Sequence, residues 1–339
     1  MKALVLRRYG GPEAMRIEDR PPPVVGGRDV LIDIRAAGLN PLDAKLREGK
    51  VKLAVPLKLP AVLGSDVAGV VTACGGEVTK FNVGDEVFAR LEKLRMGGFA
   101  EEVAAHEDVV AKKPANTTFA DAAAVPLAGL TSLQALRDVA KLKAGQRVLI
   151  HAGAGGVGSL AIQIAKILGL HVTTTTSTKN VELVKQLGAD EVIDYTKERV
   201  VDRAKDLDAV FETLGGASEL EALRIVKRGG VVVGIGGLPD LAFAREWLPV
   251  FVRPALWLMT ARRRRIAKEH GTRFEYLFMR PDGKELAELA AWIDEGRLRP
   301  ILHRTYPFAE IGEAFVELER GHARGKIVVT NQPANSSST

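Results

Sequence analysis

Three glycines follow a short apolar run near the middle of this chain of 339 residues. The run is Val148–Ile150, and Gly153, Gly155 and Gly158 have the spacing G-x-G-x-x-G. One glycine lets the backbone turn off a strand, the next lets a pyrophosphate approach without meeting a Cβ atom, and the last lets a helix pack close to the sheet. The N-terminus of that helix suits phosphate because its first N–H groups and its dipole are positive. The pattern predicts a dinucleotide site made by Gly153, Ala154, Gly155, Gly156, Val157 and Gly158.

The next strand ends in hydroxyl side chains and a lysine. Ser177 lies 19 residues after Gly158, where enzymes that use NAD carry an acid that binds both ribose hydroxyls. Hydroxyls and Lys179 suit the 2′-phosphate of NADPH, which a carboxylate would repel. We therefore expect NADPH as the cofactor. The alternative for Lys179 is a solvated residue in the first turn of a helix.

Strands and helices alternate from Gln146 onward, as in a parallel, doubly wound sheet. Strands are expected at Val148–His151, His171–Thr176, Glu191–Asp194, Asp208–Glu212 and Gly230–Ile235, and helices near Gly156, Lys179, Lys197 and Ala217. Gly234, Ile235 and Gly236 end the fifth strand, at the edge where such sheets bind ligands. Leu238–Gly271 is expected to be an irregular link with helical pieces. A strand at Phe274–Met279 and an amphipathic helix at Asp282–Glu295 follow.

The first 122 residues alternate apolar and polar side chains as half-buried strands do, without a helical rhythm. The expected strands are Val30–Ala36, Val67–Ala73, Asp85–Ala89 and Phe99–Ala105. Short strands between glycine turns favour a small, largely antiparallel barrel.

The composition is that of a globular enzyme, with 48 Lys and Arg against 42 Asp and Glu and a net charge of +6. The single cysteine, Cys74, excludes an internal disulfide framework and a cysteine-based zinc cluster. Met1–Arg7 is too poor in apolar residues for a signal peptide, and no stretch is long enough for a membrane helix. We expect a cytoplasmic protein without membrane insertion, with a disordered polar tail at Gln332–Thr339.

Several motifs together resemble the medium-chain dehydrogenase/reductase superfamily, and within it the zinc-independent quinone oxidoreductase branch. They are Ala37–Asp43 (GxNxxD), Gly64–Val71 (GxDxAGxV), Val83–Val87 (GDxV), Ala152–Gly158 (AGAGGVG), Leu187–Asp190 (LGAD) and Gly325–Val329 (GKIV). The resemblance implies an α/β protein with a GroES-like β-barrel catalytic domain, residues 1–122 and 296–339. A Rossmann domain with a doubly wound parallel sheet, residues 123–295, would bind the cofactor.

The resemblance also concerns metal. Asn40 stands where zinc alcohol dehydrogenases of this superfamily have a cysteine, and Ser65 and Asp66 replace a histidine and a glutamate. A lone carboxylate is a poor zinc site, so we expect no metal. Without a Lewis acid, quinones and enones fit better than alcohols, because hydrogen bonds can polarise their carbonyl group.

The resemblance implies further site residues. Asn40, Asp43 and Lys45 would contact the nicotinamide ribose and shape the acceptor pocket, although many relatives have a tyrosine in place of Lys45. Asp43 could instead cap a helical turn. Thr131 matches a threonine near the nicotinamide, with a plain helix residue as the alternative. Further cofactor contacts would come from Tyr195, otherwise a packed strand end, and from His322, Ala323 and Arg324, the last otherwise a surface cation.

We therefore expect an NADPH-dependent, zinc-free oxidoreductase that transfers hydride to quinones or α,β-unsaturated carbonyl compounds, with water or a ribose hydroxyl supplying the proton. One alternative is an NADPH-binding protein with a non-enzymatic role on RNA or lipid; a weaker one is an alcohol dehydrogenase.

Relatives pair edge to edge through the strand matching Phe274–Met279, which implies a homodimer. Arg262–Arg265 is expected on a solvated face, with membrane or RNA contact as a weaker hypothesis, and His151 in the core.

Overall fold

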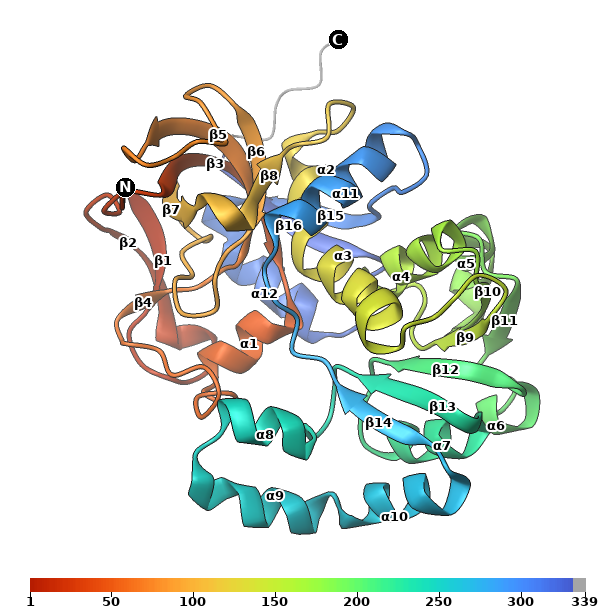
Figure 1. The fold of residues 1–339 in the computed structure, drawn as a ribbon. Helices are drawn as coiled ribbons and strands as arrows, with labels where there is room; N and C mark the ends of the chain where they lie inside the picture. Colours follow the sequence, from red (N-terminus) through yellow and green to blue (C-terminus); the bar gives the residue numbers. More distant parts are fainter. Residues whose placement is uncertain (332–339) are drawn as a thin grey trace. The chain divides into compact units, whose positions relative to one another are not determined.

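The computed structural model describes residues 1–331, and the tail predicted to be disordered, Gln332–Thr339, lies outside them. The chain forms two compact units (Figure 1). Unit 1 contains Met1–Leu130 and Arg280–Thr339, and unit 2 contains Thr131–Met279. The units divide eight residues after the expected first boundary and sixteen residues before the expected second one.

Unit 2 is built on six parallel strands in the order β11-β10-β9-β12-β13-β14. Their bounds are β9 Arg147–Ile150, β10 His171–Thr176, β11 Glu191–Asp194, β12 Leu207–Glu212, β13 Val226–Gly234 and β14 Arg273–Tyr276. The centre of the sheet is fully apolar, since Val148, Leu149 and Ile150 are inaccessible to solvent. Such runs belong to strands covered on both faces. The predicted doubly wound sheet is confirmed, with the ends of β10 and β11 as expected.

Helices connect these strands and pack on them. They are α4 Gly156–Ile167, α5 Val181–Gln186, α6 Val200–Arg203 and α7 Ala217–Ile225, with the 3-10 turn η4 at Thr178–Asn180. The stretch from Leu238 to Gly271 was expected to be an irregular link with helical pieces, and most of it is helical. It forms α8 Leu241–Trp247, η5 Val250–Val252, α9 Arg253–Met259 and α10 Ala261–His270. Pro254 occupies the start of α9, where its missing N–H costs nothing.

Unit 1 contains a seven-stranded sheet and a three-stranded one. In the larger sheet the order is β15-β16-β3-β5-β6-β8, with β7 also paired to β3, and only the β15–β16 pair is parallel. Its strands are β3 Asp29–Leu39, β5 Asp66–Cys74, β6 Glu86–Arg90, β7 Glu102–His106, β8 Val110–Lys112, β15 Leu302–Pro307 and β16 Lys326–Thr330. The smaller sheet, β2-β1-β4, was not predicted; its strands are β1 Lys2–Leu6, β2 Met15–Asp19 and β4 Ala61–Val62.

The two ends of the chain meet in the larger sheet. β16 pairs antiparallel with β3, so that Ile327 lies opposite Leu39. The helices of unit 1 are α1 Pro41–Arg47, α2 Phe119–Ala123, α11 Gly283–Asp294 and α12 Ile311–Glu319, and α3, Pro126–Leu133, leads into unit 2. A π-helical turn, η3, continues α3 over Gln134–Val139. In residues 1–331, no helix combines the length and the apolarity that crossing a bilayer requires.

Candidate functional site

The glycine turn joins β9 to α4 at the carboxyl end of the sheet. The N–H of Gly153 bonds to the carbonyl of Thr175 at 2.9 Å, and the N–H of Gly155 bonds to the carbonyl of Ala152 at 2.9 Å. The first bond of α4 runs from the Ser159 N–H to the Gly155 carbonyl, at 2.9 Å. The N–H groups before Ser159 therefore point beyond the helix end, and Gly155, the cap residue, has no side chain to cover them. This end of α4 can accept an anion.

The three glycines have different roles in the turn. A Cβ atom on Gly153 would lie 2.1 Å from Thr174 Oγ1, and one on Gly158 would lie 2.3 Å from the Ala152 carbonyl oxygen. A Cβ on Gly155 would meet only that carbonyl oxygen, at 3.3 Å. The residue with positive φ is Ala152, at 53°, and not Gly153. Gly153 and Gly158 thus allow close packing, whereas Gly155 leaves open space at the helix end.

Other predicted cofactor residues lie at the same edge of unit 2. Ser177 follows β10 and begins η4, which carries the exposed Lys179. Tyr195 follows β11 and is 59% exposed. Gly234 ends β13, and the N–H of Ile235 bonds to the Glu212 carbonyl at 3.0 Å. Parallel strands place all their carboxyl ends at one edge, so unit 2 brings these residues to the same edge as the glycine turn.

One carboxylate at this edge was not weighed from the sequence. Asp194 ends β11 and accepts hydrogen bonds from the hydroxyls of Thr178, at 2.5 Å, and Thr196, at 2.7 Å. These hydroxyl bonds lower the pKa of Asp194 to about 2, and the Lys197 ammonium lies 3.5 Å away. Asp194 therefore carries a charge that its neighbours already compensate.

His151 precedes the turn and is a core residue, as predicted. Its ring is 5% exposed, its Nδ1 lies 3.3 Å from Thr175 Oγ1, and burial lowers its pKa. The neutral ring packs beneath the turn, so His151 is not a candidate proton donor.

Unit 1 contains a second polar site, buried between the ends of β3, β5, β6 and β16. Asn40 Nδ2 donates to Asp66 Oδ2 at 2.9 Å, and Asp66 Oδ1 accepts from the Leu127 N–H at 3.0 Å. The Lys326 ammonium donates to Asn40 Oδ1, to the Leu39 carbonyl at 2.9 Å and to Asp66 Oδ2 at 3.5 Å. Arg90 Nε lies 4.0 Å from Asp66 Oδ1. We call Asn40, Asp43, Asp66, Arg90 and Lys326 the buried polar cluster; each is at most 5% exposed.

Asp43 lies at the third position of α1 and caps this helix, because its Oδ2 accepts the Asn40 N–H at 2.8 Å. The capping alternative for Asp43 is therefore observed. Its other oxygen, Oδ1, is buried and has no hydrogen-bond partner among the described residues; the same holds for Ser65 Oγ and Arg90 Nε. Burial raises the pKa of Asp43 to about 7, with a further contribution from the charge of Asp66.

Sequence reasoning did not select Lys326 or Arg90 for this cluster. The signal for Lys326 was present in the GKIV motif, but only the pairing of β16 with β3 brings the lysine to Asn40. Burial lowers the pKa of Lys326, while the carboxylates of Asp66 and Asp43 act in the opposite direction. The result is a cation held by the residues that stand where zinc dehydrogenases carry their ligands.

The remaining predicted residues lie on α1, in the turn before β16 and in α3. Lys45 is on the exposed side of α1, away from the buried polar cluster. His322 and Arg324 are exposed in the turn before β16, with Ala323 between them, and the Arg324 N–H bonds to His303 Nδ1 at 3.3 Å. Thr131 is buried in α3, at the start of unit 2.

Comparisons with known proteins agree with this architecture. A family model described as zinc-binding dehydrogenase matches residues 187–329, and one described as alcohol dehydrogenase GroES-like domain matches residues 26–115. The mouse protein named NAD(P)H oxidoreductase RTN4IP1, mitochondrial, is 35% identical over 97% of this chain and 89% of its own length. The Arabidopsis thaliana protein named NADPH-dependent alkenal/one oxidoreductase, chloroplastic, is 38% identical over 97% of this chain and 79% of its own length.

A solved structure agrees too. The quinone oxidoreductase from Coxiella burnetii has a TM-score of 0.84 and 34% identity, covering 98% of this chain and 99% of that one. The chain belongs to the quinone oxidoreductase branch of the medium-chain dehydrogenase/reductase superfamily. The resemblance inferred from the motifs is confirmed, and the two units correspond to the GroES-like and Rossmann parts of this family.

The family model's description mentions zinc, so the donor set of this member deserves a direct test. At the family's metal position this chain offers an amide, a hydroxyl and a carboxylate, from Asn40, Ser65 and Asp66. The amide and the carboxylate are already bonded to the Lys326 ammonium. Within residues 1–331, no three His, Cys, Asp or Glu side chains are grouped so that they could hold a metal ion. These donors do not fit a catalytic zinc, which takes three protein ligands from Cys, His and Asp or Glu, whereas here only Asp66 is of these types.

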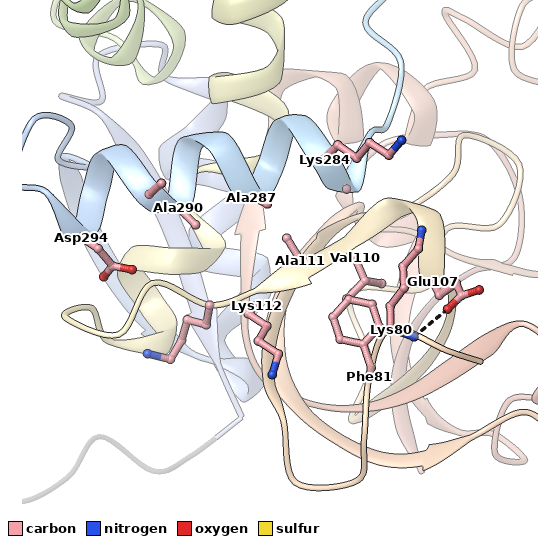
Figure 2. A pocket seen from close by; sticks show the side chains of 13 residues that line it. Lys80, Phe81, Glu107, Val110, Ala111, Lys112, Lys284, Ala287, Ala290 and Asp294 are labelled. Carbon is pink, nitrogen blue, oxygen red and sulfur yellow. Dashed lines mark hydrogen bonds between the residues drawn. The ribbon is translucent and has the colours of Figure 1, made fainter.

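The lining of a pocket of about 480 Å³ in unit 1 includes none of the predicted site residues (Figure 2). Its walls include Ala287 and Ala290 of α11 and Val110 and Ala111 of β8. Most of its charged side chains are committed to structural bonds: Lys80 pairs with Asp108, Lys112 with Asp85, Lys113 with Glu86, and Glu107 with Arg28. The pocket therefore offers apolar walls but little free polar chemistry.

Proposed function

We propose that this chain is an NADPH-dependent oxidoreductase that transfers hydride to quinones or α,β-unsaturated carbonyl compounds. The observation that carries the proposal is the N-terminus of α4, whose first N–H groups are left uncovered by the glycine turn. The neighbouring strand β10 is followed by Ser177 and Lys179 and not by an acid. The names of the curated relatives, which include an alkenal/one oxidoreductase that depends on NADPH, support the same cofactor and acceptor class.

Each predicted cofactor residue of unit 2 has a proposed role in binding NADPH. The N–H groups of Gly156, Val157 and Gly158 would hold the pyrophosphate, and the open space at Gly155 would admit it. Ser177 and Lys179 would bind the 2′-phosphate, with Tyr195 beside it. Gly234 and Ile235 would line the nicotinamide end of the site at β13. By family resemblance, His322, Ala323 and Arg324 of unit 1 are further cofactor residues.

For the acceptor, the proposal assigns Asn40, Asp43, Lys45 and Thr131. NADPH, when bound, supplies the hydride. The Asn40 amide has two N–H donors, and Asp66 accepts one of them. The other can donate to an acceptor carbonyl, and the bond from Lys326 to Asn40 Oδ1 fixes the orientation of the amide. The unpartnered Asp43 Oδ1, Ser65 Oγ and Arg90 Nε leave polar capacity in the same buried region, as expected of a site that holds a polar ligand or water.

The proposal requires no metal. The Lys326 ammonium supplies positive charge at the place where zinc dehydrogenases hold their zinc ion. Polarisation of the acceptor's carbonyl group then relies on hydrogen bonds. Water or a ribose hydroxyl would deliver the proton to the reduced acceptor.

Two further parts of the proposal concern assembly and location. We propose a homodimer formed through β14, which is the end strand of its sheet. One outward N–H of this strand, that of Tyr276, already bonds to Asp240 at 2.8 Å, so pairing would use the rest of the edge. A cytoplasmic location stays a prediction, and the two curated relatives named above are mitochondrial and chloroplastic.

Titration calorimetry with NADPH and NADH tests the cofactor assignment. We expect the wild type to bind NADPH at least about tenfold more tightly than NADH, and Ser177→Asp to remove this preference by charge repulsion. Lys179→Ala should weaken NADPH binding and leave NADH binding unchanged. Lys185→Ala, a change on the exposed face of α5, is the matched control. Equal affinity of the wild type for both nucleotides would contradict the assignment.

A further inference from the structure

The segment between β13 and β14 exposes a group of large apolar side chains. Five of the fourteen exposed large hydrophobic residues in the described chain fall within ten positions; they are Val250, Phe251, Trp257, Leu258 and Met259, between 54% and 77% exposed. We call these five residues the apolar ridge. Scattered surface hydrophobics need no explanation, but these five lie on one short segment, as the apolar residues of an interaction site do.

The ridge lies on η5 and α9, which pack mainly against each other and against α8 and α10 (Figure 1). Leu256 is buried and anchors α9 to these helices. Successive helical residues are about 100° apart, so Leu258 lies nearly opposite Leu256 on α9 and Trp257 lies to one side; both are exposed. The apolar side chains therefore face away from the core of unit 2 instead of toward it.

Cations surround the ridge. Residues 241–270 contain seven Arg and Lys but only two Glu. Arg264 lies over the Trp257 ring, with its guanidinium carbon 4.7 Å from the ring centroid, and donates to the Trp257 carbonyl at 2.7 Å. Arg262 and Arg265 are exposed on α10, where Arg265 also pairs with Glu269 at 2.7 Å. Tryptophan and aliphatic side chains next to arginines are the composition of segments that lie in a membrane interface.

The Arg262–Arg265 run is only partly a solvated face. Arg263 is buried, pairs with Glu219 at 3.1 Å and lies over the Phe274 ring at 3.8 Å, so this residue holds α10 to unit 2. The other three arginines remain at the surface or beside Trp257. The fixed residue orients the run, and the exposed cations can act on a partner.

A hollow of about 320 Å³ adjoins the ridge. Its lining combines apolar side chains with two arginines: Leu241, Ala244, Val250, Pro254 and Trp257, with Arg245 and Arg253. The Arg253 guanidinium donates to the carbonyls of Arg245 and Leu248, whereas Arg245 is exposed. An apolar hollow with a cation beside it suits the upper part of a lipid acyl chain and its anionic headgroup.

We propose that the apolar ridge docks this chain on the surface of an anionic lipid bilayer, with Phe251, Trp257 and Leu258 in the interface and the arginines on the headgroups. Charge complementarity favours lipid over a second copy of the chain, because a symmetric contact would place each arginine cluster near its own counterpart. Lipid is also favoured over RNA, because the side chains of Val250 and Leu258 have no charge or hydrogen-bond donor with which to bind an RNA phosphate. The inference is independent of the proposed enzymatic function.

Vesicle flotation of the purified full chain tests the inference. We expect the chain to float with vesicles of phosphatidylcholine and phosphatidylglycerol, and to remain in the dense bottom fraction when the vesicles contain phosphatidylcholine alone. Leu258→Ser should weaken partitioning about tenfold through lost apolar burial. Arg262→Gln and Arg265→Gln should weaken it about fivefold each, and high salt should act in the same direction. Leu94→Ser is the matched control, since Leu94 is 66% and Leu258 69% exposed.

A second readout follows Trp257 itself. Brominated acyl chains in the anionic vesicles should quench tryptophan emission of the wild type. Trp257→Phe should lose this quenching and still float, because phenylalanine keeps the apolar contact. Quenching that persists in Trp257→Phe would place the contact at Trp247 or Trp292 and overturn the proposal.

Three other results would also overturn it. The first is a wild-type chain that ignores anionic vesicles. The second is a change from dimer to monomer in Leu258→Ser by light scattering without loss of vesicle binding, which would make the ridge a contact between copies. The third is binding of polyuridylate that weakens in Arg262→Gln but not in Leu258→Ser, with vesicle binding absent. NADPH binding, measured without vesicles, should be the same in all these variants, so failure here is distinct from failure of the proposed function.

Discussion

At the scale of single residues, Asp43 is the group whose protonation the fold changes most clearly. Its carboxyl is buried, one oxygen caps α1, and the other oxygen has no hydrogen-bond partner among residues 1–331. Burial raises its pKa from 3.8 to about 7. The folded chain therefore holds a proton that the unfolded chain releases between these two values, and folding becomes less favourable as pH rises through that window.

Asp43→Asn should remove this dependence, because an amide imitates the protonated carboxyl and can still cap α1. Relative to the wild type, the variant should gain about 2–4 kcal/mol of unfolding free energy between about pH 4 and about pH 8. Urea unfolding at both pH values measures the change, and Asp202→Asn on the exposed surface is the control. Parallel pH profiles for the wild type and Asp43→Asn would contradict this account of the carboxyl.

Lys326 and Asp66 form the ion pair on which the buried polar cluster depends. Lys326→Met should lower the unfolding free energy by about 3–5 kcal/mol, because it leaves the buried Asp66 carboxylate with only the more distant Arg90 guanidinium, 4.0 Å away, to offset its charge. Adding Asp66→Asn should recover part of the loss, since the amide is neutral and can still accept from the Leu127 N–H. Urea unfolding of the two variants measures this coupling.

Lys112→Met is the control for the lysine, because Lys112 makes an exposed ion pair with Asp85 at 3.3 Å. Surface pairs of this kind contribute about 0–1 kcal/mol. A loss in Lys326→Met no larger than the loss in Lys112→Met would show that the cluster does not depend on its cation.

At the scale of elements, two glycines of the turn are needed for close packing, and the third is proposed to leave room for the cofactor. Gly153→Ala and Gly158→Ala place a Cβ within 2.1 Å and 2.3 Å of neighbouring oxygens, so each should lower the unfolding free energy, by about 1–3 kcal/mol. Gly155→Ala has room, with one contact at 3.3 Å, and should keep its stability while losing at least about tenfold in NADPH affinity. Urea unfolding and calorimetry on the same three variants measure both effects. NADPH binding by Gly155→Ala as tight as that of the wild type would contradict the proposed cradle.

The elements also show which patterns the sequence could predict. The ends of β10 and β11 follow directly from short apolar or β-branched runs between turns. Helix α1 was foreseen only as a helical turn that Asp43 could cap, because seven residues beginning with Pro41 are too few to display a helical period. The helices of Leu238–Gly271 were underestimated for a related reason, since each is short and only their packing against one another makes them stable.

Of the two candidate sites, only the nucleotide site could be predicted from sequence spacing. The nucleotide residues follow from local spacing, because one strand, one turn and one helix contain most of them. The buried polar cluster does not, because Asp66 and Lys326 are far apart in the chain and meet only when β16 joins β3 and β5 in one sheet. Sequence spacing cannot reveal a pair that sheet registration creates.

At the scale of the whole molecule, the chain contains two kinds of chemistry in two compact units. Unit 2 presents open helix N–H groups at the carboxyl edge of a parallel sheet, and unit 1 encloses an amide, two carboxylates and two cations. The family of quinone oxidoreductases combines these parts, and the proposed reaction uses the first for NADPH and the second for the acceptor. The central claim is that this reduction proceeds without a bound metal ion.

The most direct measurement is NADPH oxidation, followed by the loss of reduced-nicotinamide absorbance, with a broad panel of quinones and enones after treatment of the protein with a chelator. The account predicts that at least one acceptor class oxidises NADPH at a rate that the chelator leaves unchanged. An NADPH signal that no acceptor alters, or an activity that the chelator abolishes and zinc restores, would contradict it.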